Sequence, residues 1–178
     1  MTCIVGIQVE GSVLMAADSA AVSGWEGIAT TTAKVFRVGD MLIGYTTSFR
    51  MGQILQYHLS LPVDNGEDSP HAYLVRRFIP EIRSLFREHG YMERENERES
   101  GGQFLVGYRG RLYTIDSDFQ VNGNRLGYAS IGVGSSYAMG AMYATQKWEN
   151  PGERLQAALE SAEAFCIAVK RPFFTEML

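Results

Sequence analysis

The chain has 178 residues, 46% of them apolar and 11% aromatic, and its formal net charge is −4 at pH 7. A chain of this length buries roughly 70% of its unfolded surface on folding, which is enough for one domain over residues 1–178. The negative charge argues against a nucleic-acid-binding surface, and no apolar run approaches the roughly 18 residues of a membrane span. We therefore expect a cytoplasmic protein in which Cys3 and Cys166 are reduced thiols.

Apolar periodicity predicts the elements of the first half of the chain. Strands are expected at 2–9, 12–18, 30–38 and 41–47, followed by helices at 49–60 and 70–89. The second helix has a clear start, with Ser69 as N-cap and Pro70 at its first position. Pro80 lies inside the same pattern and should kink this helix.

The second half repeats the order of strands followed by helices. The charged run Glu93–Glu99 is expected to be a solvated helix end or loop, with a docking surface as the alternative. The other elements are strands at 103–108, 111–116 and 126–131, helices at 134–149 and 151–169, and a strand at 173–177. Strand pairs alternating with helix pairs predict an α+β fold, a four-layer αββα sandwich.

Thr2 is the candidate nucleophile. Removal of Met1 would leave a threonine with a free α-amine, whose ordinary pKa of about 7.7–8.0 suits a general base near neutral pH. A hydroxyl activated by its own N-terminal amine is a known arrangement for covalent catalysis. Cys3 could act in this way only if Thr2 were also removed, so we interpret Cys3 as a core residue.

Lys34 and Asp18 are the candidate partners of Thr2. An ammonium about 4 Å from the Thr2 hydroxyl would favour its alkoxide-like form by roughly 4 kcal/mol at an effective dielectric constant of 20. A buried lysine needs a carboxylate beside it, and Asp18 stands at the end of a neighbouring predicted strand. The alternative is an exposed ion pair at a strand end, which would contribute only about 0–1 kcal/mol.

In chain order, these features resemble the proteasome β-subunits and the bacterial HslV-type ring peptidases. The resemblance rests on Thr2 at the start of the first strand, on the segment Ala16–Ala21 that contains Asp18, and on Lys34 before Val35. It extends to the run Met41–Ser48 and to the glycine-rich segment Ala129–Gly140. The resemblance implies an N-terminal nucleophile hydrolase, a threonine endopeptidase that cleaves peptides or unfolded protein inside a chamber.

The same resemblance implies the rest of the site. The backbone amide of Ser48 would bind the oxyanion, at a position where the family usually has glycine. The serine that positions the α-amine in the family corresponds to Val133, with Ser130 and Ser135 as the neighbouring hydroxyls. The residues implied for the substrate pocket are Ala21, Thr32, Phe36, Thr46 and Arg50. An inward-pointing Arg50 would favour acidic or polar substrate side chains; the alternative is that it pairs with a neighbouring subunit.

Partners and ions also follow from the resemblance. It implies self-assembly into rings of six or seven subunits stacked in pairs, with an ATPase unfoldase as a candidate partner and with no nucleic-acid or membrane partner. No cofactor is required, but a structural Na⁺ would bind the backbone carbonyls of Glu163, Cys166 and Val169. The histidines show no metal-ligand spacing.

Two other functions are open. A catalytically silent ring-forming homologue would explain Val133 and Ser48, where the chain departs from the family. A small-molecule amidase would use the same N-terminal nucleophile chemistry. The start of the chain at the nucleophile favours a catalytic subunit of the bacterial type.

Overall fold

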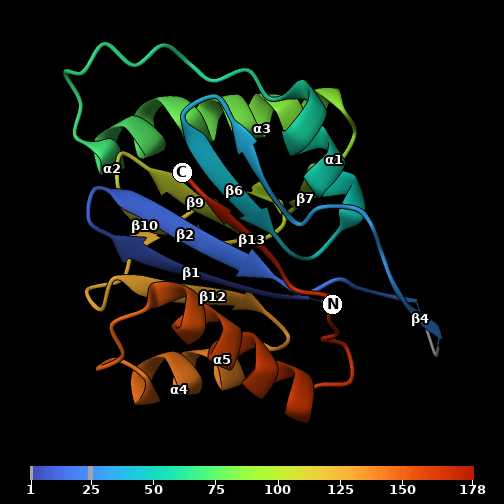
Figure 1. Ribbon diagram of the computed structural model, residues 1–178. Coiled ribbons are helices and arrows are strands. Elements are labelled where there is room, and N and C mark those ends of the chain that lie inside the picture. The colour runs from blue at the N-terminus through green and yellow to red at the C-terminus, as the bar shows by residue number, and fades with distance from the viewer. Residues whose placement is uncertain (1, 24–25) are drawn as a thin grey trace.

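The computed structural model describes residues 2–23 and 26–178, so Met1 and its expected removal lie outside the described residues. Within them, two sheets stack face to face and helices cover both outer surfaces (Figure 1). The expected αββα sandwich is confirmed. None of the described helices has the length and apolar character needed to cross a bilayer.

Each sheet brings together strands that are distant in sequence. The first has the order β12-β1-β2-β13, from β12 (Tyr128–Gly132), β1 (Cys3–Val9), β2 (Ser12–Ala17) and β13 (Phe174–Met177). The second has the order β11-β10-β9-β6-β5, from β11 (Val121–Gly123), β10 (Arg111–Ile115), β9 (Phe104–Tyr108), β6 (Met41–Tyr45) and β5 (Val35–Val38). The first sheet therefore joins the N-terminal strand to the segment before the glycine-rich turn.

The helices begin where the sequence places their caps. The Ser69 hydroxyl accepts from the Ala72 amide at 3.2 Å, and the Asn150 side chain accepts from the Gly152 amide at 2.9 Å. The outer layer on the second sheet contains α1 (Phe49–His58), α2 (Pro70–Tyr73) and α3 (Ile79–Glu88). The layer on the first sheet contains α4 (Ser135–Ala144) and α5 (Pro151–Phe165), which both end earlier than expected.

The helix predicted at 70–89 is interrupted by a π-helical turn, η1 (Leu74–Phe78), just before Pro80. Proline has no N–H to donate, and its ring crowds the carbonyl of the residue four positions earlier. The wider turn accommodates both effects. Where a kink at Pro80 was predicted, the structure has a π-helical turn between α2 and α3.

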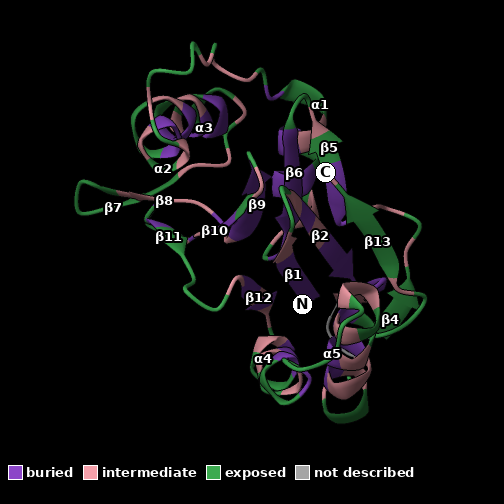
Figure 2. Ribbon diagram, turned by 60° about the vertical axis from the view of Figure 1, so that its left-hand side comes forward, coloured by how far each residue is buried: buried purple, intermediate pink, exposed green. Residues whose placement is uncertain are grey.

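Strand alternation divides the apolar side chains of β1 between two layers. Cys3 and Val5 pack towards α4 and α5, whereas Ile4 packs between the two sheets. Leu42 of β6 lies in the same inter-sheet layer as Ile4. The buried strands stand out in Figure 2, which shows the sheets as the centre of the molecule.

The sequence analysis missed the edge strand β11 and two hairpins outside the main sheets. One is formed by β3 (Ala20–Ser23) and β4 (Glu26–Ala29), and β4 extends beyond the sheets on the side of the N-terminus (Figure 1). The strand predicted at 30–38 accordingly begins only at Val35. The other is formed by β7 (Glu93–Glu95) and β8 (Arg98–Ser100) in the charged run, which is solvated in part as expected but is not a helix end.

Glu99 links this second hairpin to α3 through ion pairs with two arginines of that helix. Its carboxylate accepts from Arg87 Nε at 2.7 Å and from Arg83 Nε at 2.9 Å, and these bonds, led by Arg87, lower the pKa of Glu99 to about 2 from an ordinary 4.5. A carboxyl whose folded pKa is depressed stabilises the fold above its unfolded pKa and loses that contribution as pH falls through its folded pKa.

Glu99→Gln should therefore lower the urea midpoint of unfolding at neutral pH, and its difference from the wild type should shrink as pH falls from 4.5 towards about 2. Glu97→Gln is the control, because that side chain is 91% exposed and should leave the midpoint unchanged. A difference for Glu99→Gln that stays constant with pH would contradict this account.

Candidate active site

Lys34 and Asp18 form a buried ion pair. Lys34 Nζ donates to Asp18 Oδ1 at 2.9 Å and to the Ala20 carbonyl at 2.7 Å, and the two charged side chains are 1% and 0% exposed. Burial lowers the pKa of the Lys34 ammonium below its ordinary 10.5, and the Asp18 carboxylate opposes that shift. The pair is not the exposed strand-end ion pair that was the alternative.

The Asp18 carboxylate also holds the backbone around the start of β1. Its Oδ1 accepts from the Cys3 amide at 2.9 Å, and its Oδ2 accepts from the amides of Ala20 at 2.8 Å and Lys170 at 3.4 Å. These bonds connect the lysine, the residue after Thr2 and the segment between α5 and β13. The predicted grouping of Asp18 and Lys34 beside the N-terminal strand is therefore present.

Thr2 lies buried at the beginning of β1, with 5% of its surface exposed. Its carbonyl oxygen accepts from the Gly134 amide at 3.5 Å. Gly132, which pairs with Cys3, has a φ of +92°, and a methyl group there would lie 2.1 Å from the Thr2 carbonyl oxygen. The backbone of Thr2 is thus packed directly against the glycine-rich turn.

Cys3 is a core residue, as the sequence analysis expected. It is fully buried, and burial raises the pKa of its thiol to about 12. A thiol that stays protonated at neutral pH is a poor nucleophile. The thiol chemistry of Cys3 therefore does not compete with Thr2.

The amide of Ser48 has a different partner from the expected oxyanion. It donates to the Thr46 carbonyl at 2.9 Å across a γ-turn centred on Thr47, whose φ is +74°. The Ser48 hydroxyl accepts from the Arg50 amide at 3.1 Å and so caps α1. Within residues 2–23 and 26–178, the Thr47 amide donates to no hydrogen-bond partner. The sequence analysis did not anticipate the conformation of Thr47, because a β-branched residue rarely adopts positive φ.

Val133 leaves the turn beside Thr2 without the expected hydroxyl. Its side chain is apolar and half exposed. Ser130, considered as a replacement, donates to the Ile4 carbonyl at 2.7 Å and lies 3.8 Å from Cys3 Sγ. The Ser130 hydroxyl is therefore engaged with β1, in the layer between the first sheet and helices α4 and α5.

A cavity of about 270 Å³ lies beside the first hairpin, and the side chains around it are mostly apolar. It is lined by Ala21, Val22, Glu26, Ile28 and Phe49. Of the residues expected to line a substrate pocket, Ala21 does so here. Phe36 packs against Tyr45 in the core. Thr32 and Thr46 lie outside this cavity, half-buried and buried respectively, and Arg50 is exposed. Phe49, which precedes Arg50 on α1, lines this cavity, and the expected preference for acidic substrates stays a prediction.

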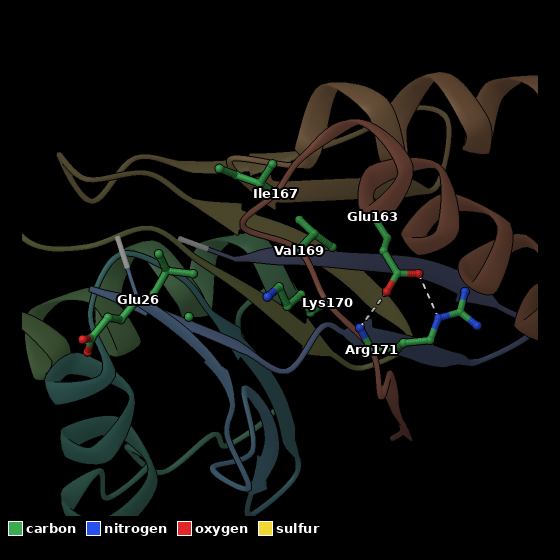
Figure 3. A pocket seen from close by; sticks show the side chains of 8 residues that line it. Glu26, Glu163, Ile167, Val169, Lys170 and Arg171 are labelled. Atoms are coloured by element: carbon green, nitrogen blue, oxygen red, sulfur yellow. Dashed lines mark hydrogen bonds and ion pairs between the residues drawn. The ribbon is translucent and has the colours of Figure 1, made fainter. Parts of the chain in front are cut away.

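A larger cavity of about 670 Å³ lies between the hairpin of β3 and β4 and the segment from the end of α5 to Arg171 (Figure 3). Glu163 and Arg171 face each other there, with Arg171 Nε 2.8 Å from Glu163 Oε2, whereas Lys170 and Glu26 extend separately (Figure 3). The Lys170 carbonyl accepts from the Ser19 amide at 2.9 Å. The cavity therefore adjoins the segment that holds Asp18.

The expected Na⁺ ligands lie in the last turn of α5 and in the turn that follows. Carbonyls at a helix end lack helical partners and are suitable cation ligands, although the Cys166 carbonyl already accepts from the Val169 amide at 3.0 Å. A Na⁺ at Glu163, Cys166 and Val169 stays a prediction. In the part of the chain that the structure describes, no group of three or more His, Cys, Asp or Glu side chains could hold a metal.

No protein-family model and no curated protein sequence matches this chain. Solved structures do match. The structure of BPH from Thiobacillus denitrificans in complex with epoxomicin has a TM-score of 0.82 at 23% identity, over 99% of this chain and 98% of that one. Eukaryotic HslV from Trypanosoma brucei has a TM-score of 0.71 at 17% identity, over 99% of both chains.

Anbu from Yersinia bercovieri, described as an ancestral β-subunit, has a TM-score of 0.67 at 13% identity, over 99% of this chain and 81% of that one. These similarities extend over almost the entire length of this chain. The resemblance drawn from Thr2, Asp18 and Lys34 is confirmed at the level of the fold. The chain has the proteasome-type fold of the N-terminal nucleophile hydrolases.

Proposed function

We propose that this chain is a threonine-type peptidase subunit that acts through Thr2, in a form of the chain that begins at that residue. The observation that carries the proposal is the buried Lys34–Asp18 pair, bonded to the Cys3 amide directly after Thr2. A buried ion pair is weak evidence for stability alone, because desolvation offsets much of its attraction. Its position beside a candidate nucleophile gives it a chemical role.

In this mechanism the Thr2 hydroxyl attacks the scissile carbonyl while the α-amine accepts its proton. The amine then returns the proton to the leaving nitrogen, and an ester to Thr2 Oγ1 remains, which water hydrolyses. Lys34 has three N–H groups and commits two to Asp18 and Ala20, so the third can act on the Thr2 oxygen. We assign the oxyanion contact to the Thr47 amide, since that of Ser48 is engaged.

Self-assembly into rings is part of the same proposal, as is peptide or unfolded protein as the substrate. The fold shared with HslV and Anbu supports it. An ATPase unfoldase remains a candidate partner. A catalytically silent subunit is the second candidate, favoured by the apolar Val133 and by the engaged Ser48 amide.

Epoxomicin should form a covalent adduct with Thr2 in protein that begins at Thr2. Epoxomicin is bound in the structure of the Thiobacillus denitrificans protein, which makes it a suitable probe. Intact-mass analysis should show the chain without Met1, and peptide mapping should place the adduct on Thr2. A variant that retains a residue before Thr2 is the control and should stay unmodified, because its nitrogen lies in an amide bond.

Absence of an adduct on a free Thr2 would favour the silent subunit. An adduct together with hydrolysis of acylated amino acids, and with no cleavage of peptides, would favour the small-molecule amidase. Cleavage of peptides by protein that still carries Met1 would contradict the assignment of the nucleophile.

A further inference from the structure

Thr46 and the backbone of Thr2 lie close together beside Gly132, at one end of the layer between the sheets. Side chains alternate along a strand, so Thr46 follows Leu42 and Gly44 on one face of β6. That face packs on β1, since a Cβ at Gly44 would lie 2.8 Å from Ile4 Cγ2. Thr2, two residues before Ile4, shares the Ile4 face. Continued for one residue beyond the end of β6 and before the start of β1, this alternation directs Thr46 and Thr2 towards each other.

The packing around Gly132 places the Thr46 hydroxyl beside Thr2. A methyl group at position 132 would lie 2.1 Å from the Thr2 carbonyl oxygen and 3.2 Å from Thr46 Oγ1. The backbone of Thr46 is already bonded, because its amide donates to the Gln103 carbonyl at 3.1 Å and its carbonyl accepts from Ser48. Thr46 is 6% exposed, so its hydroxyl acts inside the site and not on the surface.

Two other hydroxyls near this end of the sheet, those of Ser130 and Ser19, have different partners. Ser130 donates to the Ile4 carbonyl, and Ser19 donates to the Lys170 carbonyl at 3.1 Å. Val133 has no polar side-chain atom. An N-terminal amine that serves as a base needs a fixed orientation, and the Thr46 hydroxyl lies beside the backbone of Thr2.

We propose that Thr46 is a positioning residue whose hydroxyl accepts a hydrogen bond from the α-amine of Thr2, in place of the hydroxyl missing at position 133. The inference rests on the proposed function of Thr2. With one N–H held by Thr46, the lone pair of the amine is directed at Thr2 Oγ1. The acceptor also stabilises the ammonium form and raises the pKa of the amine. The charged groups of the site, Lys34 and Asp18, are the same in every variant compared.

The test compares Thr46→Val, which keeps the shape and removes the hydroxyl, with Thr46→Ser, which keeps the hydroxyl. Loss of one hydrogen bond to a group that becomes charged should slow epoxomicin adduct formation by about 10–100-fold in Thr46→Val. The acidic limb of its pH–rate profile should move to lower pH, because the ammonium loses its acceptor. Thr46→Ser should retain both the rate and the profile.

Val133→Ser in the Thr46→Val background should restore at least part of the rate, since it returns a hydroxyl from the other side of Thr2. Equal thermal midpoints of Thr46→Val and Thr46→Ser would separate positioning from folding. A Thr46→Val rate within twofold of a reactive wild type, with an unmoved pH profile, overturns the inference and leaves the proposed function intact. A wild type that begins at Thr2 and forms no adduct overturns both.

Discussion

Lys34→Met should abolish acylation of Thr2 and also destabilise the fold. The ammonium is expected to favour the Thr2 alkoxide by roughly 4 kcal/mol, which corresponds to about a thousandfold in rate. Methionine keeps the length of the side chain but leaves the buried Asp18 carboxylate without its countercharge. Breaking a buried pair in this way typically costs about 3–5 kcal/mol of unfolding free energy. Adduct formation and urea unfolding measure the two effects separately.

The double variant Asp18→Asn/Lys34→Met distinguishes chemistry from packing. Removing both charges should recover part of the lost stability, because no unpaired ion stays buried. The recovery is partial because the asparagine NH2 group cannot accept from the backbone amides that Asp18 binds, whereas the reaction of Thr2 should stay abolished. Lys147→Met is the matched control, since Lys147 is exposed, and should change neither measurement. Retention of a wild-type adduct rate in Lys34→Met would remove Lys34 from the mechanism.

The sandwich could be predicted because its central strands carry continuous apolar runs. β1 and β6 are almost wholly buried, and each was predicted within two residues of its observed bounds. The hairpin of β3 and β4 has no such signal, because the β4 residues are exposed and receive their geometry from pairing with β3. Hairpin strands without a buried face leave no alternation to detect.

The Asp18–Lys34 pair could be proposed from residue type and from the resemblance, but its neighbours required the fold. Phe49 and Arg50 are adjacent on a helix, where successive side chains point about 100° apart. An alignment that is wrong by one residue therefore assigns the exposed Arg50 to a position where the cavity is lined by Phe49. The positive φ of Thr47 cannot be inferred from a threonine. The juxtaposition of Thr46 and Thr2 depends on how the two sheets stack, which no local pattern encodes.

Gly132→Ala should displace Thr2 and abolish its reaction with epoxomicin. The new Cβ would lie 2.1 Å from the carbonyl oxygen and 2.8 Å from the carbonyl carbon of Thr2. Both are backbone atoms, so no side-chain rotation relieves the contact. A residue other than glycine at a φ of +92° also adds strain of about 1–3 kcal/mol. We expect a loss of unfolding free energy of about 3 kcal/mol or more, typical of severe overpacking.

Gly140→Ala is the matched control, because it makes the same chemical change on α4, where a Cβ would meet no described atom within 4 Å beyond the backbone of its own helix. Alanine is favoured over glycine in a helix interior by about 0.5–1 kcal/mol, so this variant should be slightly more stable and react normally. Urea unfolding and adduct formation on both variants test the comparison. If Gly132→Ala were as stable and as reactive as Gly140→Ala, close packing against Gly132 would not be what fixes Thr2. The loss expected in Gly132→Ala alone would instead show that Thr2 is positioned through its backbone, by a turn that accepts only glycine.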